Sequence, residues 1–260
     1  MSAANECESL EKCLPEGQVV DRAWLKARGF DRPRIDYYLR SGALETVTRG
    51  VYRKQGPPLK WEHIVYSLQE LGCSVHVGGR SALELQGMAH FLPLQGMRIL
   101  TLYSSQRLPA WLKKLDLPFS FEQHSPRLFK NMPEQAITTR PFGHWDWPIR
   151  HALPELALLE MLAEVRTEAD FSFVDKFFES ALMMRPQLIR ELLLQCTNVK
   201  AKRLFLWFSE RYEHPWKKVL DITGVSLGSG KRMIIKGGVL DKQYEITVPK
   251  GFAHGAEPFF

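Results

Sequence analysis

Residues 21–42 read DRAWLKARGFDRPRIDYYLRSG, and this stretch decides the fold of the N-terminal part of the chain. A short helix is predicted at its start, because Gly29 suits the position after a helix where φ is positive. Asp31 can cap the next helix, and Pro33 fits its first turn. Gly42 then closes that helix. Two helices joined by a short turn with a glycine are typical of a helix-turn-helix.

The second predicted helix has one apolar face. Ile35, Tyr38 and Leu39 recur at helical spacing, which predicts that they face inward. Residues on the other side then point outward, where Arg can bond guanine or phosphate and where Tyr and Ser can bond phosphate. The candidate DNA-binding residues of this helix and its entry are Arg32, Arg34, Tyr37, Arg40 and Ser41.

A β-hairpin is predicted after the second helix. Residues 44–47 and 50–53 read as two strands around a turn, and such a hairpin would be the wing of a winged helix. It adds the candidate phosphate contacts Arg49, Arg53 and Lys54. Between residues 21 and 54 the chain has nine basic residues against four acidic ones, and this local excess is the electrostatic pattern of a nucleic-acid-binding segment.

The rest of the chain predicts a second, larger domain. The run 56–58, Gly-Pro-Pro, can continue neither a helix nor a central strand, so a linker is expected there. We therefore predict an α+β protein, with a winged helix-turn-helix domain over 1–56 and a mixed α/β domain over 60–260. The second domain can be divided into a mixed α/β part, 60–150, and a helical part with C-terminal β-structure, 151–260.

Composition narrows the class of protein. The 260 residues have a net charge of +6, which favours polyanionic partners. A membrane span is not expected, because the sequence has no run of about eighteen apolar residues. The first fourteen residues do not resemble a signal peptide, so a cytoplasmic location is expected. The four cysteines form no C-x-x-C pair, which favours reduced thiols over a disulfide framework or a zinc site.

The sequence offers no catalytic constellation. Residues 224–232 resemble a phosphate-binding P-loop, but the glycine spacing is one residue too long and Arg232 replaces the Ser or Thr that would hold magnesium. Asp146 lies between two tryptophans, yet no second carboxylate stands at a known catalytic spacing, and a turn is the better interpretation. We therefore expect no catalytic residue, no metal and no cofactor, and no enzymatic activity.

A second basic region lies near the C-terminus. Three of its cations stand near the start of a predicted helix, and two lie on the Gly-rich turn discussed above. We hypothesise that they form a surface that binds a polyanion, with ordinary solvated charges as the alternative. These residues are Lys200, Lys202, Arg203, Lys231 and Arg232.

Several segments resemble one known family. WLKARG (24–29), YLRSGALE (38–45) and TRGVYR (48–53) are similar to the N-terminal winged-helix segment of AbiEi-type antitoxins. Segments farther along the chain resemble the same family: VGGRSALELQG (77–87), LPELALLE (153–160), VKAKRLF (199–205) and LGSGKR (227–232). One departure is Leu153 and Leu156, where relatives are expected to have Ser and Arg.

The resemblance implies an antitoxin of a type IV toxin–antitoxin system, which acts in abortive phage infection. Such proteins repress their own operon by binding double-stranded DNA at repeats in its promoter, so two molecules are expected on one operator. Their C-terminal domain counteracts a nucleotidyltransferase-like toxin, without assumed direct contact. Two alternatives stay open from the residues: a nucleic-acid-processing enzyme with a winged-helix targeting module, and an interaction protein whose basic face meets an acidic partner.

Overall fold

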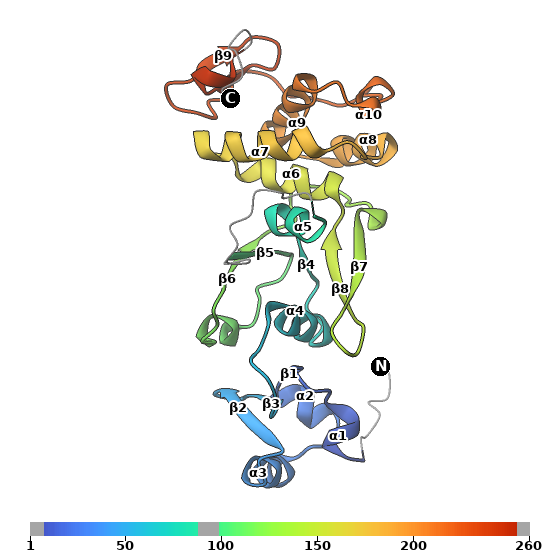
Figure 1. Ribbon diagram of the computed structural model, residues 1–260, viewed down its shortest axis with the longest axis vertical. Helices are drawn as coiled ribbons and strands as arrows, with labels where there is room; N and C mark the ends of the chain where they lie inside the picture. The colour runs from blue at the N-terminus through green and yellow to red at the C-terminus, as the bar shows by residue number, and fades with distance from the viewer. Residues whose placement is uncertain (1–7, 88–98, 254–260) are drawn as a thin grey trace. The chain divides into compact units, whose positions relative to one another are not determined.

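The computed structural model describes residues 8–87 and 99–253 (Figure 1). Its α-helices are α1 (Leu10–Cys13), α2 (Arg22–Ala27), α3 (Arg32–Arg40), α4 (Trp61–Glu70), α5 (Gly79–Leu85), α6 (Pro154–Glu164), α7 (Glu168–Ser180), α8 (Pro186–Gln195), α9 (Val199–Arg211) and α10 (Pro215–Lys218). Its strands are β1 (Val19–Asp21), β2 (Leu44–Thr48), β3 (Val51–Lys54), β4 (Val75–Val77), β5 (Ile99–Ser104), β6 (Ser120–His124), β7 (Ile137–Phe142), β8 (Trp147–Ala152), β9 (Val239–Asp241) and β10 (Ile246–Val248). Short 3₁₀ helices are η1 (Ala110–Lys114), η2 (Glu134–Ala136) and η3 (Lys250–Phe252). The predicted mixture of helices and strands is confirmed.

The chain divides into two compact units, each assembled from separate segments. Unit 1 comprises Met1–His76, Met97–Gln123 and Thr139–Arg150. Unit 2 comprises Val77–Gly96, His124–Thr138 and His151–Phe260. The domain limits expected from the sequence, 1–56 and 60–260, stay a prediction.

The N-terminal segment of unit 1 has the predicted helices and hairpin. Strands β1, β3 and β2 form an antiparallel sheet in that order, and β2 and β3 are consecutive in the chain. A register shift between Thr46 and Thr48 bends the hairpin. Helices α2 and α3 pack with this sheet around the buried side chains of Leu25, Phe30 and Ile35. This small core fixes which face of α3 is left exposed.

A five-stranded sheet follows in the chain, with the order β6-β5-β4-β8-β7. Strands β4 and β8 pair in parallel, with Val77 opposite His151. From the sequence, the residues around Asp146 are expected to form a turn. Asp146 does lie in that turn, at φ of 51°, and β8 begins directly after it at Trp147.

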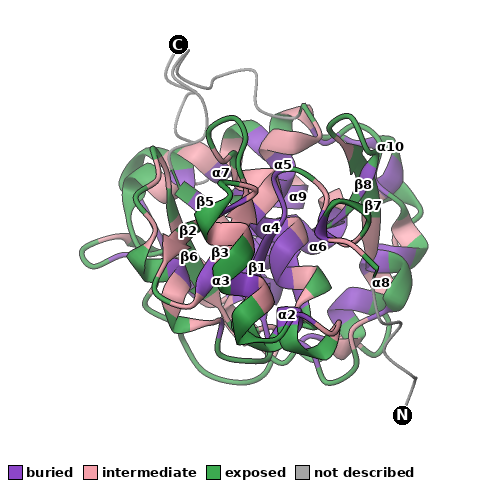
Figure 2. Cartoon of the chain, turned by 90° about the horizontal axis from the view of Figure 1, so that it is seen from below, coloured by how far each residue is buried: buried purple, intermediate pink, exposed green. Residues whose placement is uncertain are grey.

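Helix α6 is the centre of unit 2. Nine of its eleven residues are buried, and Figure 2 accordingly colours it largely purple. Two of the buried residues are carboxylates, and each has a partner within the unit. Glu155 accepts hydrogen bonds from the backbone and guanidinium of Arg185, and Glu160 accepts one of 2.8 Å from the backbone N–H of Gly79. Hydrogen bonding of this kind allows an acidic residue inside an apolar core.

The cysteines differ from expectation at one position. Cys13 is disulfide-bonded, whereas Cys73 and Cys196 are free thiols. The expectation of reduced cysteines is therefore wrong for Cys13. Spacing excluded a C-x-x-C pair, but it does not exclude a disulfide between cysteines that are farther apart in the chain.

Candidate nucleic-acid interface

The turn between α2 and α3 is fixed by capping. Asp21 accepts a 2.8 Å hydrogen bond from the backbone N–H of Trp24 at the start of α2. Gly29 has φ of 83°, as expected for the residue that reverses the chain after a helix. Asp31 then accepts a 3.1 Å hydrogen bond from the backbone N–H of Arg34 and begins α3. These local contacts determine the direction in which α3 leaves the turn.

One face of α3 is open to solvent. Ile35 is buried on the inner side, whereas Arg32, Tyr37 and Arg40 are exposed on the outer side. The Tyr37 side chain remains 62% exposed although its ring contacts that of Tyr38 edge to face, with centroids 5.4 Å apart. The predicted outward position of Tyr37 and Arg40 is confirmed, and Arg32, which was placed at the entry to the helix, is exposed as well.

Arg34 has a different orientation from the one predicted. Its guanidinium donates hydrogen bonds to the carbonyl oxygens of Gly29 and Glu8, at 3.0 and 3.3 Å, and lies over the ring of Phe30 at 4.6 Å from the centroid. The prediction that Arg34 points outward is wrong, because these local acceptors hold its side chain against the protein. Arg34 therefore ties the α2–α3 turn to the segment before α1.

The three cations of the hairpin differ in exposure. Arg49 is exposed in the turn before Gly50, whereas Lys54 is half-buried at the end of β3. Arg53 pairs with Glu45 on the neighbouring strand and donates a 2.8 Å hydrogen bond to the carbonyl of Pro57. Its side chain is only 14% exposed, so Arg49 is the most accessible of the three for a polyanion.

Two further residues shape the end of α3. The Ser41 hydroxyl donates a 3.1 Å hydrogen bond to the carbonyl of Tyr38, and the residue is exposed. The Nε of Arg40 donates a 3.2 Å hydrogen bond to the carbonyl of Asp36, and the side chain is exposed. Asp36 lies on the same face, four residues from both Arg32 and Arg40. It was not among the candidate residues predicted from the sequence.

Comparison with known families covers both parts of the chain. Residues 3–94 match the family model described as "Transcriptional regulator, AbiEi antitoxin N-terminal domain", and residues 98–249 match "Transcriptional regulator, AbiEi antitoxin, Type IV TA system". The chain belongs to the AbiEi antitoxin family of transcriptional regulators. This confirms the resemblance inferred from the sequence, and it agrees with the expectation that the chain is not an enzyme, because the family is one of regulators.

The fold of the chain is similar to that of a solved structure. The crystal structure of the RV2827C protein from Mycobacterium tuberculosis is similar to it, with a TM-score of 0.54 and 16% sequence identity. The likeness covers 88% of this chain and 85% of that chain, and at this identity it concerns the fold alone. No curated protein matches the chain.

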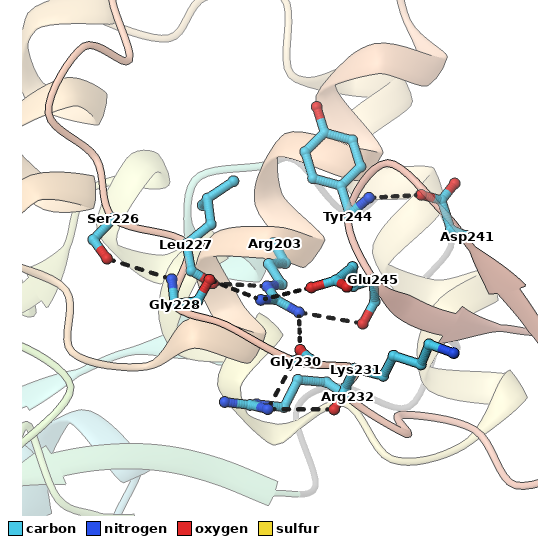
Figure 3. Close-up of polar contacts among 10 residues, drawn as sticks. All are labelled: Arg203, Ser226, Leu227, Gly228, Gly230, Lys231, Arg232, Asp241, Tyr244 and Glu245. Carbon is cyan, nitrogen blue, oxygen red and sulfur yellow. Dashed lines mark hydrogen bonds and ion pairs between the residues drawn. The ribbon is translucent and has the colours of Figure 1, made fainter.

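Two residues of the second basic region do not lie on the surface that we hypothesised. Arg203 is 2% exposed and Lys202 is 6% exposed, so both lie inside unit 2. Figure 3 shows the Arg203 guanidinium enclosed by the segment from Leu227 to Gly230 and by Glu245. The prediction of a surface position is therefore wrong for Lys202 and Arg203, because tertiary packing places them among the helices of the core.

Arg203 organises the Gly-rich segment. Its guanidinium donates to the carbonyl oxygens of Leu227 at 2.8 Å, Gly230 at 2.7 Å and Gly228 at 3.2 Å. A further bond of 3.2 Å reaches the carbonyl of Glu245, whose carboxylate lies 3.6 Å away. We refer to Arg203 with these acceptors as the arginine clamp. It satisfies carbonyls of the Gly-rich segment, and its own donors are thereby bonded within the protein.

The other three candidates of this region differ among themselves. Lys200 is half-buried and donates a 3.0 Å hydrogen bond to the carbonyl of Val165, and burial lowers the pKa of its ammonium group. Lys231 and Arg232 are exposed, with the Arg232 guanidinium turned onto the carbonyls of Gly230 and Lys231. For these three residues a role in binding a polyanion stays a prediction.

The described residues give no support for a P-loop, a metal site or a membrane-spanning helix. Arg232 bridges to Ile246 in extended backbone, so the Gly-rich segment does not open a helix as a P-loop must. Among residues 8–87 and 99–253, no group of three His, Cys, Asp or Glu residues could hold a metal ion. Within the same ranges, no helix is long and apolar enough to cross a membrane.

Proposed function

We propose that the N-terminal segment is a winged helix that binds double-stranded DNA in the promoter of its own operon and represses it. The observation that carries this proposal is the exposed face of α3, where Arg32, Tyr37 and Arg40 stand free of the small core that supports the helix. Arginine side chains on one face of a helix can bond guanine in the major groove and phosphates beside it. Arg49 in the hairpin turn adds a phosphate contact.

The roles of the candidate residues differ under this proposal. Arg32, Tyr37 and Arg40 contact bases and adjacent phosphates, and Arg49, Ser41 and Lys54 contact phosphates. Arg34 and Arg53 support the interface without contacting DNA, because their guanidinium groups already bond carbonyls of the protein. Operators of helix-turn-helix proteins are repeats read by two copies, so two molecules occupy one operator.

The C-terminal part counteracts a toxin under the same proposal. Membership in an antitoxin family of type IV systems supports this, and the nucleotidyltransferase-like class of toxin comes from the family resemblance. The protein acts in the cytoplasm, where its promoter DNA is found. Direct contact with the toxin is not part of the proposal.

DNA binding is tested by titrating the full chain with DNA from upstream of its gene and with a scrambled duplex, at two salt concentrations. The expected result is tighter binding to the promoter, with an affinity that falls steeply as salt rises, because bound cations are released from the phosphates. Equal and weak binding to both duplexes would overturn the regulator proposal. The chain would then be a basic protein whose partner is an acidic protein or an RNA.

Toxin counteraction is tested by co-expression in bacteria. A nucleotidyltransferase-like toxin encoded beside this gene should arrest growth, and the chain should restore it. The Arg40→Ala variant should restore growth as well as the wild type while it fails to repress a promoter-linked reporter. Loss of both functions in a folded Arg40→Ala variant would contradict the division of roles between the N-terminal and C-terminal parts.

A further inference from the structure

Asp36 lies at the centre of the exposed face of α3. It stands four residues after Arg32 and four residues before Arg40, and residues at this spacing are neighbours on one side of a helix. The Asp36 side chain is 54% exposed and that of Arg32 is 78% exposed, whereas the adjacent Ile35 is buried. An acidic residue therefore occupies the middle of the surface assigned to DNA.

The fold does not need this carboxylate. Capping of α3 is provided by Asp31, and the polar contact of the Asp36 side chain is a 3.8 Å pair between its Oδ2 and the Nε of Arg32. An exposed ion pair of this length contributes little to stability. Aspartate also has a lower helix propensity than alanine. The contacts within the fold therefore give Asp36 little to do for stability.

A carboxylate on this face has two opposite effects on the affinity for DNA. Phosphates repel it, so Asp36 weakens binding to every sequence by a similar factor. The major groove offers it hydrogen-bond donors only at the exocyclic amino groups of bases, and the amino group of cytosine is the one that Asp side chains accept from. In a DNA sequence with cytosine at the right position this hydrogen bond offsets the repulsion. In a sequence without that cytosine the repulsion is not offset.

We propose that Asp36 is a specificity-determining residue, which accepts a hydrogen bond from the N4 amino group of cytosine and weakens binding to DNA that lacks this cytosine. This inference rests on the proposed function. The helical rise places Arg32 and Arg40 about 6 Å from Asp36 along the axis in either direction. The operator half-site should accordingly contain a cytosine close to guanines bonded by these arginines.

The experiment compares the affinities of the wild type, Asp36→Ala and Asp36→Asn for the promoter and for the scrambled duplex at one salt concentration. Both variants should bind the scrambled duplex about fivefold more tightly, since one negative charge is lost near the phosphates. Their ratio of promoter to scrambled affinity should fall by about tenfold, as expected when a base contact is lost. Asp36→Asn should moreover tolerate adenine where the wild type requires cytosine.

Asp116→Asn is the matched control, because it removes the same charge from an exposed residue outside the N-terminal segment. Its two affinities should stay within about twofold of the wild type. An unchanged ratio in the Asp36 variants, beside a selective wild type, would overturn the inference and leave the proposed function intact. A wild type that does not distinguish the two duplexes would overturn both.

Discussion

The exposed face of α3 and the arginine clamp in unit 2 contain the same kind of residue in opposite environments. Arg32 and Arg40 extend from a helix face that the small N-terminal core leaves open. Arg203 is 2% exposed and donates to the carbonyls of Leu227 and Gly230, among others. Arg32 and Arg40 are available to a partner, whereas the hydrogen-bond donors of Arg203 are already bonded to acceptors of the chain itself.

This difference shows that basic residues close together in the sequence do not by themselves mark a binding surface. In both regions the sequence places several cations near the start of a helix. What separates them is whether the fold supplies enough carbonyl and carboxylate oxygens to replace water around the guanidinium. A buried arginine with four backbone acceptors stabilises the fold, whereas an exposed arginine keeps its donors available to a partner.

The largest expected effect is on stability, from Arg203→Ala. The substitution leaves the carbonyls of the Gly-rich segment without their donor and removes a buried guanidinium from the core, so unfolding of the chain should need roughly 3 kcal/mol less free energy. Chemical denaturation of the full chain measures this. Arg232→Ala, an exposed neighbour, should change the free energy of unfolding by less than about 0.5 kcal/mol. Equal free energies of unfolding for the two variants would show that Arg203 stabilises the fold no more than an exposed arginine does.

The next effect is on DNA selectivity, from Arg40→Ala or Arg32→Ala. Each variant should lose about 1–3 kcal/mol of binding free energy on the promoter, because a guanine contact disappears, and much less on the scrambled duplex. The free energy of unfolding should stay close to that of the wild type, since both side chains are exposed. Titration with both duplexes provides the measurement. Equal losses on both duplexes would reassign the arginine to a phosphate.

Arg34→Ala should fall between these two classes. Its bonds to Gly29 and Glu8 are partly exposed, so their loss should lower the free energy of unfolding by about 1 kcal/mol. Affinity should decrease by the same factor for the promoter and for the scrambled duplex, because the turn before α3 loosens without the loss of a base contact. A loss of affinity for the promoter alone would show that Arg34 breaks its bonds to Gly29 and Glu8 and contacts a base.

The smallest effect is expected from Arg49→Ala. An exposed cation in the hairpin turn should contact one phosphate, so its removal should reduce the slope of log affinity against log salt by about one unit. Both duplexes should show the same change. Arg53→Ala provides the contrast, because Arg53 is held by Glu45 and Pro57 and should alter the slope less. An unchanged slope in Arg49→Ala would remove the hairpin from the interface.

Local signals made the α2–α3 region predictable. The cap at Asp31 and the positive φ of Gly29 depend on contacts within a few residues, and the sequence predicts both. The inward turn of Arg34 was missed because one of its acceptors, Glu8, lies 26 residues earlier in the chain. Exposure on a helix face follows from periodicity, whereas the partners of a long side chain do not.

The arginine clamp could not be predicted in the same way. Its acceptors lie 24 to 42 residues after Arg203, and no sequence spacing brings them together. The same helix buries the aromatic side chains of Phe205, Trp207 and Phe208. Whether a cation on such a helix is exposed depends on the tertiary packing of the Gly-rich segment.

The central claim, that the outer face of α3 lies against DNA, is tested most directly by photo-crosslinking. A photoreactive amino acid is placed at position 37 in one variant and at position 232 in another, and each is irradiated with labelled promoter DNA. Both positions are exposed, so the substitution should be tolerated at each. A crosslink to the promoter is expected from position 37 and none from position 232. A crosslink from position 232 without one from position 37 would contradict the central claim.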